Sequence, residues 1–289
     1  MIDSICICGA GTMGTGIAQA AAESGISALL YDLDHEKIRQ AELFIRKNLD
    51  SRVLKNKITE SEKKSITGRI RYSNQLADCH AAFLLEAIIE NLDAKRELFL
   101  ELEKINTGKT IFASNTSSHS ISEIARSIKN PYRMVGMHFF NPPTLMKLVE
   151  IVLTQHTSEE TKEQTISLAR KMKKTPVICK DSPGFIVNHV ARPYYLEALR
   201  LLEKGGADIE VIDQIMESSG FKMGPFRLMD LIGNDINFAV SQSIYDSMNR
   251  PARLEPSLLQ MQKLKKGELG RKSGYGFYNY DSTIKTPKP

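Results

Sequence analysis

The sequence predicts an α/β domain with a doubly wound parallel sheet, followed by an all-helical domain. Two observations lead to this prediction. Up to about residue 180, short apolar runs alternate with longer amphipathic runs, the pattern of strand–helix units. After the chain-breaking pair Pro183 and Gly184, the apolar residues recur with the helical period. We therefore expect a first domain over residues 1–182 and a second over residues 183–289.

The expected strands are short apolar runs bounded by polar or turn-forming residues. They cover residues 4–8, 28–31, 82–87, 110–114, 133–138, 147–153 and 176–179. Between Asp34 and about Ala82 the sequence predicts no strand but two helical patterns. The first covers residues 35–55, and the second opens at Thr59–Glu62, where T-E-S-E forms a capping box. We expect these two patterns to form a helical hairpin, over about residues 35–70, inserted between strands.

The remaining helices are expected where the apolar residues recur every three or four positions. In the first domain these patterns cover residues 91–105 and 158–173. In the second domain they cover residues 186–203, 209–219 and 225 to about 248. The second domain should therefore contain helices only.

Composition excludes several classes of protein. With 289 residues, 42% hydrophobic and 25% charged, the chain resembles ordinary soluble globular proteins. No apolar run approaches the roughly 20 residues of a membrane helix. The N-terminus leads directly into a strand, so we expect neither a secretory signal nor a transit peptide, and a cytoplasmic location. The net charge of +5 is compatible with an anionic ligand but selects none.

The cysteines show no spacing typical of a zinc site or a disulfide framework. Cys6 and Cys8 alternate with isoleucine and should face the same side of a strand, whereas Cys79 and Cys179 are isolated in the sequence. We therefore expect reduced, buried thiols and no metal.

The most informative N-terminal run is G-A-G-T-M-G, in which Gly9, Gly11 and Gly14 form the G-x-G-x-x-G pattern between a strand and a helix. In dinucleotide-binding folds the first glycine permits the tight turn and the second lets the backbone approach a pyrophosphate. The third lets the helix pack on the strand. A glycine-rich turn without a ligand is the alternative, but the flanking strand and helix favour a Rossmann-like domain.

Asp32 lies 18 residues past Gly14, at the end of the second expected strand. An acid at this position can accept hydrogen bonds from ribose hydroxyls, and it would repel a 2′-phosphate. NAD is therefore the expected cofactor. Glu90, Asn91 and Lys95 follow another expected strand, where ligands bind in open α/β sheets, although each could instead be a helix cap or a surface charge.

Polar side chains also follow later strands. Asn115 and Ser117 come directly after one strand, and His138 ends the next. Glu150 lies twelve residues further, on the strand after the N-P-P turn. His138 could be a structural histidine and Glu150 a solvated acid, or the two could form an acid–base pair. Asn188 lies just inside the first helix of the second domain, and we expect these polar groups to converge where the two domains meet.

Motifs along essentially the whole chain resemble the L-3-hydroxyacyl-CoA dehydrogenase family, and most of all its short bacterial 3-hydroxybutyryl-CoA dehydrogenases. These motifs are GAGTMGTGIAQ, EAIIENLDAK, ASNTSS, MHFFNPPTLMKLVEI, DSPGFIVN, GPFRLMDLIG and GRKSGYGFYNY. The resemblance implies a Rossmann-like domain and an all-helical domain that forms a homodimer. It also implies NAD-dependent oxidation of a 3-hydroxyacyl-CoA and the reverse reduction, with no metal, nucleic acid or membrane involved.

The resemblance also implies roles for single residues. His138 would be the general acid–base, and Glu150 would orient it. Ser117 and Asn188 would bind the substrate. Further contacts are expected at Met13, Glu90, Lys95 and Asn115 for the cofactor and at Asn141 for the substrate. Two positions depart from the family pattern: His119 replaces an apolar residue, and His189 replaces an arginine.

The coenzyme A moiety carries phosphates, and family members place it near the helical hairpin. Cations of this hairpin are Arg46, Lys47, Arg52, Lys55, Lys57, Lys63 and Lys64. A solvated helix face would look the same, but we select Arg52 and Lys55 as candidate phosphate ligands.

Two other functions remain open at this point. The first is a dehydrogenase of the same plan that acts on sugar acids, such as a lambda-crystallin-like L-gulonate enzyme, which would need no groove for coenzyme A. β-Hydroxyacid dehydrogenases fit less well because they use a catalytic lysine. The second is a non-catalytic, crystallin-like relative, which the presence of His138, Glu150, Ser117 and Asn188 disfavours.

Overall fold

The structure is a computed structural model in which residues 2–281 are described. The end of the predicted second domain, residues 282–289, lies outside the described residues. The chain divides into two compact units, a first unit up to Phe185 and a second unit from Ile186 onward. Among the described helices, none is long and apolar enough to cross a bilayer.

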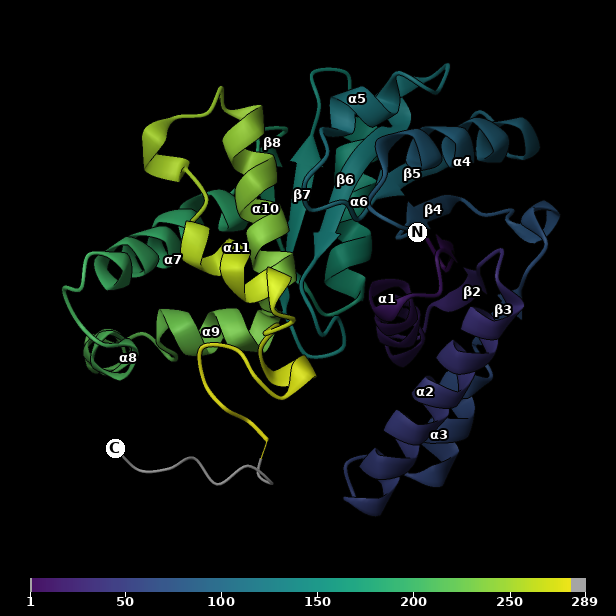
Figure 1. Ribbon diagram of the computed structural model, residues 1–289. Helices are drawn as coiled ribbons and strands as arrows, with labels where there is room; N and C mark the ends of the chain where they lie inside the picture. Colours follow the sequence, from purple (N-terminus) through teal and green to yellow (C-terminus); the bar gives the residue numbers. More distant parts are fainter. Residues whose placement is uncertain (1, 282–289) are drawn as a thin grey trace. The chain divides into compact units, whose positions relative to one another are not determined.

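The first unit is built on one sheet of eight strands in the order β3-β2-β1-β4-β5-β6-β7-β8 (Figure 1). The strands are β1 (Ser4–Cys8), β2 (Ser27–Tyr31), β3 (Ile70–Ser73), β4 (Phe83–Glu86), β5 (Ile111–Ser114), β6 (Met134–Phe139), β7 (Leu148–Leu153) and β8 (Thr175–Lys180). Neighbouring strands are parallel except β6 and β7, which run antiparallel. The expected parallel, doubly wound sheet is present, and only the β6–β7 pair departs from it, because the short turn after β6 returns the chain directly instead of crossing over through a helix.

Strand β3 was not predicted, since no strand was expected between residues 34 and 82, and this expectation is wrong. Ile70–Ser73 pairs in parallel with β2 at the edge of the sheet. Only Ile70 of its four residues is buried, and Arg71 is exposed. An edge strand this short lacks the apolar run by which the other strands were predicted.

Six helices connect these strands. They are α1 (Thr12–Glu23), α2 (His35–Leu54), α3 (Glu60–Thr67), α4 (Leu92–Ile105), α5 (Ile121–Ala125) and α6 (Glu159–Lys171). Helices α2 and α3 form the hairpin, which lies beside β2 and β3 in Figure 1. The predicted capping box is present, since the Thr59 side chain accepts from the Glu62 backbone N–H and Glu62 reaches back to Thr59.

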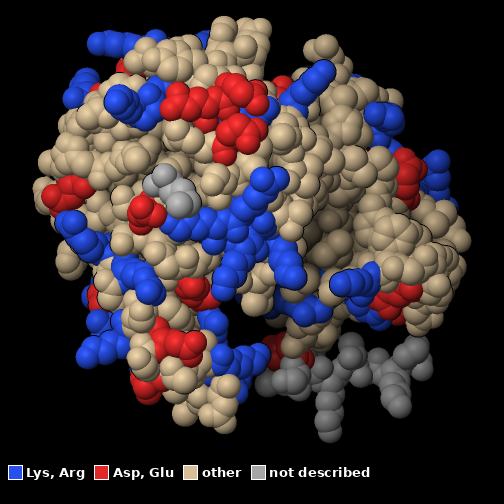
Figure 2. Space-filling view, turned by 180° about the vertical axis from the view of Figure 1, so that it is seen from behind, with Lys and Arg blue, Asp and Glu red and all other residues tan. Residues whose placement is uncertain are grey.

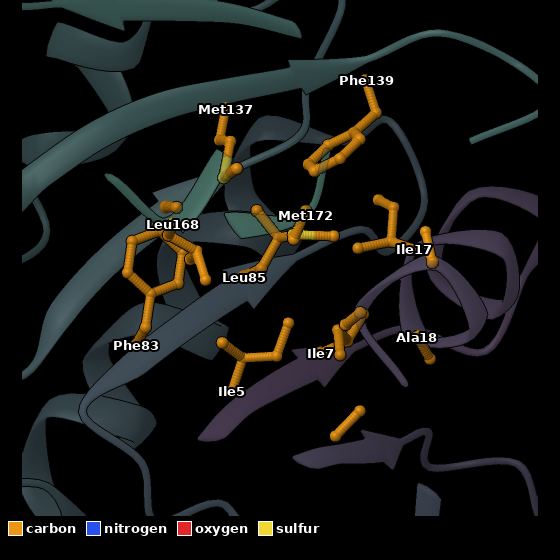
Figure 3. Close-up of a cluster of buried hydrophobic side chains, with 14 of the residues drawn as sticks. Ile5, Ile7, Ile17, Ala18, Phe83, Leu85, Met137, Phe139, Leu168 and Met172 are labelled. Atoms are coloured by element: carbon orange, nitrogen blue, oxygen red, sulfur yellow. The ribbon is translucent and has the colours of Figure 1, made fainter. Parts of the chain in front are cut away.

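The larger core of the first unit lies between one face of the sheet and the helices that cover it. Figure 3 shows Ile5 and Ile7 of β1 together with Phe83 and Leu85 of β4, all at most 2% exposed. They pack with Ile17 of α1 and with residues of β6 and α6. This core fixes the carboxyl ends of β1, β4 and β6 relative to one another, and the predicted site residues Gly9, Glu90 and His138 lie at or shortly after these ends.

The second unit is helical. Its helices are α7 (Val187–Glu203), α8 (Ile209–Ser218), α9 (Pro225–Ile232), α10 (Asn234–Ser247) and α11 (Leu258–Lys265). The single helix predicted from residue 225 to about 248 is wrong, because Gly233 adopts a φ of 103° and separates α9 from α10. Buried Asp230 accepts hydrogen bonds from the backbone N–H groups of Phe277 and Tyr278, which ties the G-Y-G-F-Y segment to α9.

Candidate active site

The glycine loop between β1 and α1 has the shape of a dinucleotide cradle. Gly9 has a φ of 114°, and a Cβ added there would lie 2.4 Å from the carbonyl oxygen of Ala87. A Cβ added at Gly14 would lie 1.8 Å from the carbonyl oxygen of Gly9. At Gly11, by contrast, no atom lies within 4 Å of an added Cβ. The first and third glycines are thus required by packing, whereas Gly11 borders open space from which a pyrophosphate can approach the backbone.

The N-terminus of α1 is suited to an anion. Gly11 is the N-cap, no side chain caps the helix, and its first turn, which includes Met13, contains no acidic residue. The backbone N–H groups and the helix dipole are therefore available to a phosphate. Asp32 follows β2 and accepts a hydrogen bond from the backbone N–H of Ala10 at 2.8 Å, so its carboxylate lies against the glycine loop. These residues fit NAD, with Asp32 as the ribose ligand.

A buried ion-pair network lies at the end of β4. Lys95 of α4 is 1% exposed, and its Nζ lies 2.6 Å from Glu86 Oε1 and 3.0 Å from Glu90 Oε2. Glu86 is fully buried and also accepts hydrogen bonds from Ser114 Oγ at 2.6 Å and from the Ile88 N–H at 2.8 Å. One cation thus joins β4, β5 and the start of α4.

Glu90 organises the loop that carries Ser117. Its Oε1 accepts from Thr116 Oγ1, from the backbone N–H groups of Ser117 and Ser118, and from Ser118 Oγ. Burial by itself raises the pKa of Glu90, but the charge of Lys95 and the hydrogen bonds from Thr116 and Ser118 outweigh it and lower the pKa to about 2. Glu90 is therefore an anion at any physiological pH, and its four hydrogen bonds hold the half-buried Ser117 in place.

Asn115 connects this loop to the next strand. It is 9% exposed, and its Oδ1 accepts a hydrogen bond from the backbone N–H of Phe139 at 2.9 Å. Phe139 follows His138 directly, so Asn115 fixes the end of β6 where the imidazole is attached.

His138 and Glu150 face each other across the β6–β7 pair. They are partners in the antiparallel register, and His138 Nδ1 lies 2.7 Å from Glu150 Oε2. Both are buried, at 6% and 1% exposure, and the His138 ring packs against the rings of Phe140 and Phe185. A carboxylate at Nδ1 favours the tautomer with a proton on Nδ1, which leaves the lone pair of Nε2 to accept a proton. The pair therefore has the geometry of a base and its orienting acid.

The other predicted residues lie in loops of the first unit or in the second unit. Asn141 is exposed in the loop between β6 and β7. Asn188 lies in the first turn of α7, where its backbone carbonyl accepts from Arg192 Nε at 2.9 Å, and His189 follows it. His119 lies beside Ser118, and its Nε2 is buried.

The hairpin cations have different environments. Arg52 pairs with Glu23 of α1 at 2.5 Å and lines a cavity of about 480 Å³ between the hairpin, α1 and the loops after β6 and α6. The charged lining residues are Arg52, Arg69, Lys147, Lys173, Lys174, Glu23 and Glu62. Lysine and arginine side chains gather near the middle of the face shown in Figure 2. Lys55, the other selected cation, is exposed at the end of α2 and does not line this cavity.

Sequence reasoning missed three polar residues that support the site. Glu86 and Ser114 lie at the ends of apolar strands, and the only sequence signal for them is a polar residue in an otherwise apolar run. Asp181 accepts hydrogen bonds from Ser120 Oγ at 2.7 Å and from the backbone N–H groups of Ile121 and Ser122, which anchors α5 behind the Ser117 loop. The D-S-P-G-F motif did not show this role, because α5 lies 60 residues before Asp181 in the chain.

Comparison with other proteins places this geometry in a family. Residues 4–182 match the NAD binding domain of 3-hydroxyacyl-CoA dehydrogenase, and residues 184–280 match its C-terminal domain. The chain is 43% identical over 281 residues to the 3-hydroxyadipyl-CoA dehydrogenase of Escherichia coli, covering 96% of this chain but only 59% of that protein. It is 41% identical to a probable 3-hydroxybutyryl-CoA dehydrogenase of Bacillus subtilis, covering 97% of this chain and 98% of that protein.

A solved structure agrees with these matches. The (S)-3-hydroxybutyryl-CoA dehydrogenase of Ralstonia eutropha superposes with a TM-score of 0.93 at 36% identity, covering 98% of this chain and 100% of that one. The predicted family, the Rossmann-like fold with a helical second domain, and NAD as the cofactor are confirmed. The chain belongs to the 3-hydroxyacyl-CoA dehydrogenase family.

Proposed function

We propose that this protein oxidises a short-chain (S)-3-hydroxyacyl-CoA, in particular 3-hydroxybutyryl-CoA, to the 3-oxoacyl-CoA with NAD, and catalyses the reverse reduction. The observation that carries the proposal is the buried pair of His138 and Glu150, 2.7 Å apart, in the same unit as the dinucleotide cradle. The names of the Bacillus and Ralstonia relatives support the choice of substrate.

In this mechanism His138 acts as the general base. Its Nε2 accepts the proton of the 3-hydroxyl. Glu150, which contacts Nδ1, stabilises the imidazolium that results. NAD, when bound, supplies the acceptor for the hydride that leaves C3. In the reverse direction His138 begins protonated and returns its proton to the ketone oxygen. Because both side chains are buried, the orientation of the imidazole is set before the substrate binds.

Ser117 and Asn188 serve as substrate ligands in this proposal. The hydrogen bonds from the Thr116–Ser118 segment to Glu90 hold the backbone of Ser117 in place, which limits where its hydroxyl can reach a substrate oxygen. We assign Asn188 the same task from the second unit. Asn141 remains a candidate contact on the exposed loop after β6.

Coenzyme A would be held by cations of the first unit. The cavity lined by Arg52 contains five cationic and two acidic side chains, so its potential is favourable for phosphates. Arg52 is the stronger of the two candidate ligands, because Lys55 projects into solvent outside this cavity.

The function is tested by following NADH oxidation with acetoacetyl-CoA on the purified full chain. We expect NADH consumption that requires the 3-oxoacyl-CoA and is lost in His138→Ala. A parallel assay with 3-oxoadipyl-CoA tests the substrate class in the name of the Escherichia coli relative. If no 3-oxoacyl-CoA is reduced but L-gulonate is oxidised with NAD, the sugar-acid alternative is correct, and if neither reacts, the non-catalytic alternative gains support.

We also propose that the protein is a homodimer formed through the second unit. Large apolar side chains of this unit are exposed, including Val190 of α7, Ile215 of α8 and Leu258 of α11, each more than half accessible. Exposed apolar residues in such number are typical of an association surface. Light scattering at micromolar concentration should give twice the mass of one chain, and the mass of one chain would contradict the proposal.

A further inference from the structure

Three cysteine thiols that are distant in the sequence meet inside the first unit. Cys6 and Cys8 point to the same side of β1, and Cys79 follows the short helical turn η1 (Leu76–Asp78). The three sulfur atoms all lie within 4.8 Å of one another, and Cys6 Sγ is 4.0 Å from Cys8 Sγ. All three residues are fully buried. Cys79 is isolated in the sequence, but the turn before β4 folds it onto β1.

The position of Cys79 is fixed by its backbone. Its N–H donates to the carbonyl of Leu76 at 2.9 Å, and its carbonyl accepts from Asn106 Nδ2 at 2.8 Å. Asn106 also accepts from the backbone N–H of Ala81, so one side chain at the end of α4 holds the segment on both sides of Cys79. Cys6 and Cys8 are fixed by the pairing of β1 with β2 and β4. The thiols are thus pre-arranged, and bringing them together on a ligand requires little backbone movement.

The distances suit a three-coordinate metal ion. With metal–sulfur bonds of about 2.3 Å, the sulfur atoms of a trigonal planar site lie about 4.0 Å apart. We propose that Cys6, Cys8 and Cys79 form a binding site for a soft monovalent cation of the Cu(I) type. Thiolate ligands select such ions. Among the described residues no other His, Cys, Asp or Glu completes the group, so the tetrahedral site that Zn(II) requires is not formed.

The test is a titration of the reduced, full-length protein with Cu(I) under anaerobic conditions, with a chromogenic Cu(I) chelator as competitor. We expect one Cu(I) per chain and, in X-ray absorption, three sulfur neighbours at about 2.3 Å. Cys79→Ser should weaken binding by at least about 10- to 100-fold, since changing even an outer-shell partner costs that much. Cys179→Ser is the matched control, because Cys179 is also buried but does not belong to the cluster, and it should bind like the unmodified protein.

Several results would overturn the proposal. They are an absence of binding in competition with the chelator, equal affinity in Cys79→Ser, an equal loss in Cys179→Ser, or Zn(II) binding as tight as Cu(I). Thermal melting without metal confirms that each variant is folded. If Cys79→Ser does not fold, Cys79→Ala and Cys6→Ser test the same ligands, and binding that survives in both contradicts the assignment.

Discussion

Lys95 and Glu86 form an ion pair of 2.6 Å in which neither side chain is more than 1% exposed. Removing one partner of a buried pair leaves an uncompensated charge away from water, which costs about 3–5 kcal/mol. Lys95→Met keeps a long side chain but deletes the cation between Glu86 and Glu90. We expect it to lower the free energy of unfolding by about that amount, measured by urea denaturation.

The matched control lies on the same helix. Lys104 pairs with Glu101 at 2.5 Å, but both side chains are more than half exposed. An exposed pair contributes little, because water and salt screen it. Lys104→Met should therefore leave the urea midpoint almost unchanged, and equal losses in both variants would show that burial is not the cause.

Glu90 should make stability depend on pH in acid. Its pKa in the folded protein is lowered to about 2 from an ordinary value of 4.5, so it stabilises the fold fully above pH 4.5 and loses this contribution as the pH falls toward 2. In Glu90→Gln the stability should be lower than in the unmodified protein at pH 6, and the difference should shrink as the pH is lowered below 4.5. A difference that stays constant from pH 6 to pH 3 would contradict this prediction.

The same variant tests the role of Glu90 in the Ser117 loop. Glu90→Gln replaces the carboxylate, which accepts four hydrogen bonds from Thr116, Ser117 and Ser118, with a neutral amide. We expect KM for acetoacetyl-CoA to rise, because Ser117 loses its fixed position. An unchanged KM with reduced stability would limit Glu90 to a structural role.

Asp32 should determine the choice of cofactor. Its carboxylate already accepts from the Ala10 N–H of the glycine loop and would repel a 2′-phosphate nearby. Asp32→Asn keeps an acceptor but removes the charge. The ratio of kcat/KM with NADH to kcat/KM with NADPH should fall by about tenfold or more, which corresponds to about 1.4 kcal/mol. Comparable kcat/KM for both cofactors in the unmodified enzyme would contradict the assignment.

Arg52 should act on coenzyme A and not on the acyl group. Arg52→Ala should raise KM for acetoacetyl-CoA and weaken its dependence on salt, while KM for acetoacetyl-pantetheine stays the same. Arg46→Ala is the control on the same helix, because Arg46 pairs with Glu42 on an exposed face. Equal effects on both substrates would exclude Arg52 as a phosphate ligand. Glu23→Gln also breaks the Arg52–Glu23 pair but keeps the cation, so it distinguishes the loss of the pair from the loss of a phosphate contact.

Most of the first unit could be predicted because each strand–helix unit carries its own periodicity. The exceptions were features set by tertiary structure. Strand β3 is stabilised by pairing with β2 and not by an apolar sequence of its own. The reversal of β7 depends on a turn, and apolar runs do not show strand direction.

Some residues of the candidate site could likewise be predicted from the sequence, whereas others depend on tertiary structure. Asp32 could be selected because an acid directly after a strand lies at the ligand-binding edge of an α/β sheet. The roles of His138, near the end of β6, and of Ser117, in the loop after β5, follow from the resemblance to the family. Glu86 could not be selected, because its role depends on the distance to Lys95 across β4 and α4. Nor could the proximity of Cys79 to Cys6 and Cys8 be predicted, since it depends on the turn before β4.

The pair of His138 and Glu150 is the central claim, and kcat of Glu150→Gln tests it most directly. The substitution keeps the shape of the side chain and removes the counter-ion of the imidazolium. We predict a fall in kcat of about 10²–10⁴, by analogy with the acid of a catalytic triad, and an unchanged Kd for NADH. His138→Ala should be at least as damaging, and the double variant scarcely worse than His138→Ala, because the two residues act as one unit. A near-normal kcat in Glu150→Gln, or single effects that simply multiply in the double variant, would contradict the account.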